Sequence, residues 1–258
     1  MPVTGGVSVS VPIILAITIA IFLGTLTRTL FGFGEAVVSM PLLALLPLHL
    51  ATAVALMGLV SLTVAGVTVT TSWRHILRQE LVPVVMAAPL GIPVGLWVVT
   101  SVPTTLVTGL LGVALVVYAA FSLLRTRLAP DAVQNRIAHP LWGVLLGFAS
   151  GVFGSAYNFT GIPVAIYGSF RGWQPRNFRS TLQAYFLILG TLIVAGQGIS
   201  GMWTLSMGRL YLFSLPAIAA AVIVGAKLQK HIPTAKFYRY VFLLVGALGV
   251  LLLMKSTG

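Results

Sequence analysis

The chain of 258 residues is 58% hydrophobic and only 7% charged, with a mean hydropathy of +1.06. Soluble domains carry about 25% charged residues, so this composition excludes a water-covered surface and predicts a membrane protein. The net charge of +12 comes from Lys and Arg in short clusters between apolar runs, which favours lipid headgroups over nucleic acid as the partner. The absence of cysteine excludes disulfides and thiolate chemistry.

Long apolar runs predict the crossing helices, because a bilayer core about 30 Å thick needs about 20 apolar residues per helix. The crossing helices are expected at 50–71, 81–100, 105–124, 179–199, 209–226 and 235–254. The first long run, 11–30, has no basic segment before it, so it is expected to be retained rather than cleaved as a leader. Runs of 10–14 residues are too short to cross and predict re-entrant half-helices; these are 36–46, 141–153 and 162–170.

The basic loops predict the topology, because Lys and Arg concentrate on the cytoplasmic side. Loops 73–80, 125–140, 171–179 and 227–234 carry basic residues, whereas 101–104 and 200–208 carry none. With every basic loop inside, 141–170 must enter and return as a hairpin from inside, and 11–47 as a hairpin from outside. Each half then contains a hairpin and three crossing helices. Because three is odd, the halves have opposite orientations.

The predicted fold is therefore an all-α polytopic membrane protein with two inverted repeats. The first repeat is expected at 1–128 and the second at 141–258, joined by a cytoplasmic linker at 129–140. Run 11–30 is long enough to cross alone, which leaves a parallel repeat of about eight simple crossing helices as the alternative.

An internal repeat supports this division. The segment Phe31–Pro41 aligns with Phe153–Pro163 at an offset of 122, and Ala65-Gly66 aligns with Ala195-Gly196 at an offset of 130. Each 11-residue segment is a Gly-rich break closed by proline. Paired interruptions in the two halves of a membrane protein indicate a transporter's substrate site.

The breaks suit a small anion. Non-helical backbone at membrane depth must be buried or line a wet cavity, and helices that resume after a break direct free N–H groups toward it. Gly32, Gly34, Gly154 and Gly161 would let the backbone approach a ligand. Alternatively, these glycines merely permit tight helix packing.

Glu35 lies in the first break, and an intramembrane carboxylate indicates function by default. Arg28 precedes it by two helical turns. Glu35 is either a structural partner of Arg28 or a group that takes up protons and couples transport to them. The other two acids, Glu80 and Asp131, lie in loops with arginines and are expected to be solvated.

The second break supplies neutral polar groups, an amide at Asn158 and a hydroxyl at Thr160. Arg179 and Gln183 are four residues apart and share a helix face. The guanidinium of Arg179 suits bidentate recognition of an oxyanion, or anchors the helix at the inner surface. Arg171 is expected to be an anchor of this second kind.

Gly91–Gly95 and Gly147–Gly151 have the GxxxG form, which permits close helix packing within one chain or between two, so a homodimer is considered. No P-loop, metal-ligand spacing or hydrolase constellation occurs in the sequence. We therefore expect neither an enzyme nor a cofactor.

The two breaks, their closing prolines and the chain length resemble the TauE/SafE family of sulfite exporters. The segments that carry the resemblance are GFGEAVVSMPLLALLP and FGSAYNFTGIPVAIYGSFRGWQPRNFRSTLQAYF. Many members have three glycines in these breaks, where this chain has Gly34-Glu35-Ala36 and Ala156-Tyr157-Asn158. The resemblance implies ATP-independent export of sulfite or a related sulfonate across a bacterial inner membrane. It also implies that Asn158, Arg179 and Gln183 are substrate ligands. An anion channel, an uptake permease and a membrane-embedded assembly partner are the alternatives.

Overall fold

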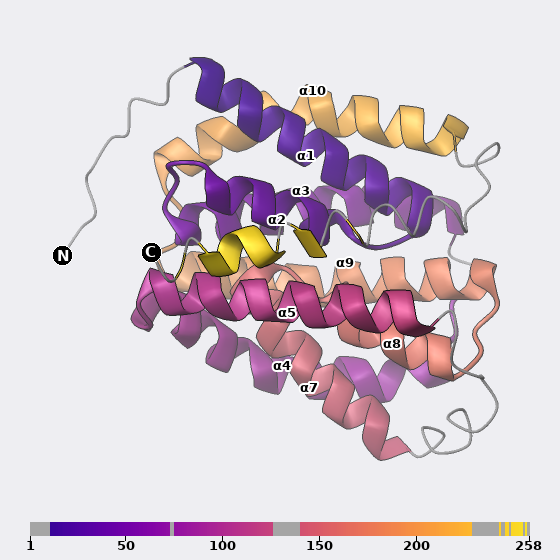
Figure 1. Cartoon of the computed structure of the whole chain (residues 1–258). Helices are drawn as coiled ribbons and strands as arrows, with labels where there is room; N and C mark the ends of the chain where they lie inside the picture. Colours follow the sequence, from indigo (N-terminus) through magenta and orange to yellow (C-terminus); the bar gives the residue numbers. More distant parts are fainter. Residues whose placement is uncertain are drawn as a thin grey trace.

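The computed structural model describes residues 11–72, 75–125 and 140–228, together with 243, 246–247, 249–254 and 256. Within these ranges the regular structure is helical throughout, as Figure 1 shows. The helices of the first half are α1 (Val11–Phe31), α2 (Glu35–Leu45), α3 (Leu50–Ser72), α4 (Arg78–Ser101) and α5 (Thr104–Arg125). Those of the second half are α7 (Pro140–Tyr157), α8 (Gly161–Phe170), α9 (Pro175–Ile199) and α10 (Leu205–Leu228).

The predicted all-α membrane fold is confirmed. Five described helices, α1, α3, α4, α9 and α10, are long and apolar enough to cross a membrane. Large apolar side chains such as Leu15, Met86 and Leu110 are exposed, and an apolar surface of this kind faces lipid rather than water. The predicted linker, apart from Pro140, and the first part of the predicted helix 235–254 lie outside the described residues.

Several helices extend beyond the apolar runs that predict them. The helix expected at 179–199 begins at Pro175, where a first-turn proline costs nothing because its missing N–H would lack a partner anyway. The helix expected at 209–226 covers Leu205–Leu228. Polar residues at these ends are compatible with helix but do not contribute to an apolar run.

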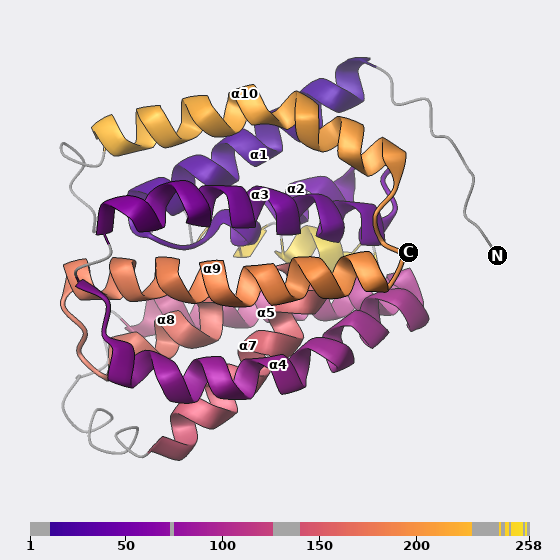
Figure 2. The same cartoon turned by 180° about the vertical axis from the view of Figure 1, so that it is seen from behind.

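The helix pairs repeat between the halves. Helix α1 packs along α10 as α7 packs along α4, and α3 contacts α10 as α9 contacts α4. Helices α3 and α9 pack on each other in the middle of the molecule in both views (Figures 1 and 2). Exchanging the two halves therefore turns each of these contacts into another observed contact.

The two GxxxG segments pack against each other within one chain. A Cβ at Gly151 of α7 would collide with the Ala88 carbonyl of α4, and a Cβ at Gly91 of α4 would collide with the Phe148 carbonyl of α7. The absence of side chains thus lets the two backbones touch. This seam leaves neither motif free for a second copy of the chain.

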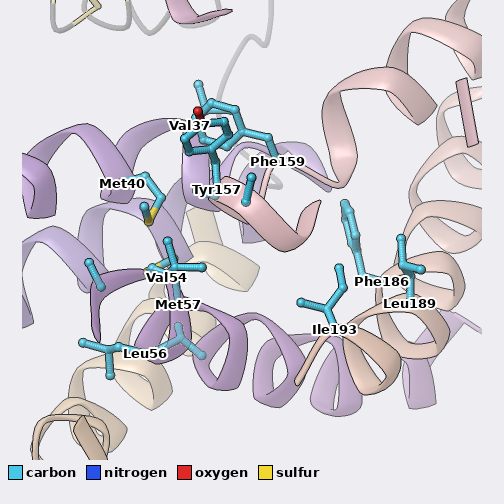
Figure 3. Packing of buried hydrophobic residues seen from close by; sticks show 14 of the residues in the cluster. Val37, Met40, Val54, Leu56, Met57, Tyr157, Phe159, Phe186, Leu189 and Ile193 are labelled. Carbon is cyan, nitrogen blue, oxygen red and sulfur yellow. The ribbon is translucent and has the colours of Figure 1, made fainter. Parts of the chain in front are cut away.

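The buried core surrounds the central helix pair. It includes Val54 and Met57 of α3, Phe186 and Ile193 of α9, and Phe159 between α7 and α8 (Figure 3). Both helix breaks lie against this core, so the non-helical backbone between α1 and α2 and between α7 and α8 is enclosed by packed side chains.

Candidate substrate site at the two helix breaks

The helices before the two breaks end alike, at an offset of 126 residues rather than the 122 inferred from the sequence, although Gly34 (φ +97°) is a second left-handed residue found in the first break and not at Thr160. Gly32 has φ +87° and donates its N–H to the Arg28 carbonyl at 2.6 Å. Asn158 has φ +59° and donates its N–H to the Gly154 carbonyl at 2.8 Å. Each left-handed residue ends a helix in the same way.

The shift of four residues comes from the prolines. Pro41 lies in the second turn of α2, whereas Pro163 is the third residue of α8, so aligning the prolines misaligns the helix starts. The structural counterpart of Glu35 is therefore Gly161, the first residue of α8, and not Tyr157. The second break has no carboxylate at the position where the first has one.

Residues of both breaks line one small cavity. Residues 33–37 contribute from the first break and 158–162 from the second, with Arg28, Ser61 and Phe186 completing the lining. The cavity volume is about 20 Å³, and a cavity of this size holds about one water molecule. An oxyanion is larger than this, so its binding needs a movement of the cavity walls.

The N-termini of two helices meet at this cavity. The first turn of α2, Glu35 to Val37, lines it. The helical hydrogen bonding of α2 begins with Val38, which donates its N–H to the Gly34 carbonyl at 3.3 Å. The first turn of α8 lines it from the other side through Gly161 and Ile162. In the first turn of α2 the backbone N–H groups lack intrahelical acceptors, whereas in that of α8 Ile162 donates its N–H to the Phe159 carbonyl at 3.3 Å and Pro163 has no N–H. The positive end of a helix dipole favours negative charge at both ends.

Arg28 and Glu35 form a buried ion pair beside these helix ends. The Arg28 Nη1 donates to Glu35 Oε2 at 2.6 Å, and the side chains are 2% and 4% exposed. Arg28 also donates to the Ser61 hydroxyl at 2.7 Å and lies over the Phe186 ring at 4.4 Å from its centre. Thr25 donates to the second carboxylate oxygen at 3.1 Å.

Gln183 fixes the position of Arg28 from helix α9. Its Oε1 accepts hydrogen bonds from Arg28 Nη2 and from the Thr68 hydroxyl, each at 2.9 Å. Its Nε2 donates to the Gly32 carbonyl at 3.0 Å. Both ends of the amide bond to protein groups and Gln183 does not line the cavity, so it supports the first break from outside.

Asn158 and Thr160 line the cavity from the second break. The Asn158 Nδ2 donates to the Val54 carbonyl of α3 at 2.7 Å. The Thr160 carbonyl accepts the Ser150 hydroxyl at 2.6 Å. Each break is thus tied to the central helix of the other half, the second through Val54 and the first through Gln183.

The structure separates the remaining predicted site residues from the cavity. Arg179 is half-buried and donates to the Leu30 carbonyl at 3.1 Å, with its side chain across Gly32. Gly154 packs against Thr160 and Ile193. Of the residues expected from the sequence, Gly34, Glu35, Arg28, Asn158, Thr160 and Gly161 line the cavity, whereas Gly32, Gly154, Arg179 and Gln183 surround it.

Sequence reasoning missed Ser61 and Phe186, which also line the cavity. Ser61 lies in the long apolar run of α3 and Phe186 in that of α9. A single serine and a single phenylalanine are common in crossing helices, so no pattern distinguishes them.

A second polar cluster lies where α8 meets α9. Glu80 at the start of α4 accepts hydrogen bonds from Arg171 Nε at 2.9 Å and from the Tyr167 hydroxyl at 3.1 Å. The expectation that Glu80 is simply solvated is wrong, since its side chain is 24% exposed and paired. The hydrogen bond with Glu80 raises the pKa of Arg171 above its ordinary value.

Aromatic rings connect this cluster to the cavity. Tyr167 contacts Trp173 at 5.8 Å between ring centres, Trp173 contacts Phe178 at 6.3 Å, and Phe178 contacts Phe33 at 6.0 Å. Phe33 lines the cavity. The rings therefore fill the space between the cavity and the α8–α9 loop.

The fold and the site define a class, a multi-pass helical membrane protein with a small cavity between two helix breaks. The model of the family described as sulfite exporter TauE/SafE matches residues 5–252, so the chain belongs to this family of membrane transporters. The family substrate is a small anion, which fits the helix ends at the cavity. No curated protein and no solved structure matches the chain.

Proposed function

We propose that this protein is a secondary transporter that exports sulfite or a related organosulfonate across the bacterial inner membrane. The observation that carries the proposal is the meeting of two helix N-termini and a buried arginine at one small cavity. Backbone N–H groups and a guanidinium are the donors that an oxyanion requires. Asn158 and Thr160 are the neutral side chains that complete the proposed binding site.

Alternating access about this cavity is the proposed mechanism. The exchange symmetry of the helix contacts supports two repeats that move against each other. The hairpins α1–α2 and α7–α8 would enter from opposite membrane faces, as the loop charges indicate. The small volume of the cavity means that its walls would move apart when substrate binds.

The proposed coupling ion is the proton, and Arg28 and Glu35 are the residues that would couple it to transport. The bond of 2.6 Å between Arg28 and Glu35 supports structural pairing of the two residues. Protonation of Glu35 would free Arg28 for the substrate, so proton coupling remains a proposal that uses the same two residues. A homodimer would need a surface other than the α4–α7 seam.

Solute counterflow tests the proposal. Purified protein is reconstituted into liposomes loaded with unlabelled sulfite, and radiolabelled sulfite is added outside. A carrier accumulates label transiently above equilibrium, a channel equilibrates without overshoot, and a protein that does not transport matches empty liposomes. Either of the last two results overturns the proposal.

A matched pair of glycine variants links the activity to the cavity. A Cβ at Gly161 would meet the Phe186 ring at 2.8 Å and Phe33 at 3.4 Å, so Gly161→Val should fill the site and abolish counterflow. A Cβ at Gly66 meets no atom within 4 Å, so Gly66→Ala should retain it. Equal activity in both variants would remove the cavity from the transport path.

A further inference from the structure

A second, larger cavity lies between the end of α2 and the start of α5. Its volume is about 150 Å³, which holds several water molecules, whereas the cavity at the breaks measures about 20 Å³. Leucines from the segment 43–50 line it together with Thr104, Thr105 and Thr108 of α5. Among the described residues that line it, none is charged. We call it the threonine cavity.

Thr108 gives the threonine cavity a buried polar group. Its side chain is only 8% exposed and lines the cavity. In the part of the chain that the structure describes, its hydroxyl has no hydrogen-bond partner, whereas Thr63 and Thr100 donate theirs to the carbonyl four residues earlier. A buried hydroxyl without a protein partner is costly unless water or a solute bonds to it. The cavity therefore suits a polar occupant.

The threonine cavity and the aromatic rings lie at opposite ends of α4. Glu80, the partner of Tyr167, is in the first turn of α4, and Thr104 follows its last turn. The 24 residues of α4 span about 36 Å. Phe33 extends the chain of rings to the cavity at the breaks, and α2 and α3 lead from there to the threonine cavity.

Each of these two helices lines both cavities. In α2, Val37 lines the cavity at the breaks and Leu43 lines the threonine cavity, about 9 Å further along the helix. In α3, Ser61 lines the first and Ala53 the second, about 12 Å apart. Among the described residues, none lines both.

Two methionines occupy the helix turns between the cavities. Met40 lies three residues from each of the two α2 residues just named, and Met57 lies four residues from each of the two in α3. Each methionine therefore shares a helix face with residues of both cavities. Both side chains are fully buried and line neither cavity. Because methionine is unbranched and flexible, both can change rotamer without movement of their helices.

We propose that the threonine cavity is the outer part of the transport path, and that Met40 and Met57 form the barrier between it and the cavity at the breaks. The proposal rests on the proposed function and adds its route. The adjoining loop 101–104 is expected outside because it carries no basic residue, so an exported anion would leave here. Hydroxyls donate to an anion without opposing its charge, and a site of release must bind weakly.

Two cysteines on α5 test whether water and solute enter the threonine cavity. Thr108→Cys and Leu110→Cys are made singly in the full-length chain, which has no native cysteine. Right-side-out membrane vesicles receive an impermeant anionic methanethiosulfonate in sulfite-free buffer, and mass spectrometry follows the reaction. Thr108→Cys should react at least about tenfold faster, because modification follows access of the reagent to the thiolate. Leu110 is 56% exposed, so exposure on the isolated chain predicts the reverse order.

The outcomes separate the route from the proposed function. If Thr108→Cys reacts no faster than Leu110→Cys, the cavity holds lipid and the route is wrong. If Thr108→Cys reacts only in inside-out vesicles, the cavity is not on the outer side and the route is again wrong. Sulfite counterflow by the wild-type protein would leave the proposed function intact in both cases.

Counterflow also tests the methionine barrier. The double variant Met40→Ala with Met57→Ala should lose the transient overshoot, because label leaks back through a barrier that no longer closes. Met86→Ala truncates a methionine that is 72% exposed on α4 and should keep the overshoot. A double variant that unfolds like the wild type on heating and still overshoots overturns the barrier.

A volume-conserving variant decides the question where the alanine variant does not fold. Met40→Leu with Met57→Leu retains the packed volume, but its branched side chains are less flexible than methionine. It should slow counterflow relative to Met86→Leu. An equal rate overturns the barrier.

Discussion

Arg28 and Glu35 close the first helix break with a buried bond of 2.6 Å across seven residues of sequence. Burial of this ion pair costs desolvation free energy, and the pair also has a proposed function. Two charges removed from water contribute little net stability, but either one left alone is strongly destabilising. A pair retained in such a place therefore indicates a role beyond stability, and the proposed role is anion binding.

Single and double variants separate the two roles. Arg28→Met or Glu35→Met alone should lower the free energy of unfolding by about 3–5 kcal/mol, because each leaves an unpaired buried charge. The double variant should recover most of this, less about 1 kcal/mol for each hydrogen bond lost with Ser61 and Gln183. Thermal unfolding in detergent measures stability, and counterflow measures transport. A stable double variant that still transports sulfite would remove Arg28 from the site.

Asn158 holds a left-handed backbone that asparagine and glycine tolerate better than alanine. Asn158→Gly should lose the bond to the Val54 carbonyl, a cost of about 1 kcal/mol. Asn158→Ala should lose the same bond and add about 1–2 kcal/mol of backbone strain. The difference between the two unfolding free energies isolates the strain. Equal stabilities would mean that φ at this position is not positive in the membrane.

The sequence predicts the broken helices well because glycine-rich interruptions are rare within apolar runs. It also locates Arg28 and Glu35, because charged side chains at membrane depth are energetically expensive and therefore rare. The sequence also predicts close helix packing at Gly91–Gly95 and at Gly147–Gly151. Only the fold shows that these two segments pack on each other.

The sequence fails where side chains act through distant partners. Gln183 accepts a hydrogen bond from Arg28, 155 residues away, and no local spacing encodes that contact. Arg179 donates to the Leu30 carbonyl and does not line the cavity, and this partner 149 residues away is likewise not encoded in any local spacing. The alignment of the breaks fails by four residues because proline occupies different turns of α2 and α8.

Single cysteines test the opposite entry of the two hairpins, since the chain has no native cysteine. Val11→Cys and His49→Cys, at the two ends of the first hairpin, should react with an impermeant maleimide from outside. Leu141→Cys and Gln174→Cys, at the ends of the second, should react only from inside. All four positions are exposed.

Ser206→Cys is the control for the outer face in the same assay. Reaction of Val11→Cys and His49→Cys from opposite faces would contradict the first hairpin. Reaction of all four positions from one face would contradict the opposite entry of the two hairpins.

The glycine seam between α4 and α7 should resist any added side chain. Gly151→Val places atoms against the Ala88 carbonyl and should lower the free energy of unfolding by about 1–3 kcal/mol. Gly208→Ala, in α10, meets no atom within 4 Å and should be neutral or stabilising by up to about 1 kcal/mol through helix propensity. Thermal unfolding of both variants checks the contrast. Equal midpoints would show that the seam opens at low cost.

Glu80 should restrain the aromatic rings more than it stabilises the fold. Its pair with Arg171 is partly exposed, so Glu80→Ala should cost at most about 1 kcal/mol of stability. The raised pKa of Arg171 keeps this arginine charged in the neutral range, so the pair does not open there by losing the arginine's proton.

The same variant tests access to the cavity. Without Glu80, Tyr167 loses the hydrogen bond that holds its ring against Trp173. An anionic thiol reagent added from inside should then modify Ile162→Cys, a cavity-lining position, faster than in the parent. Arg176→Ala, an exposed change nearby, should leave that rate unchanged. The same acceleration in both variants, or in neither, would show that the ion pair does not control access to the cavity.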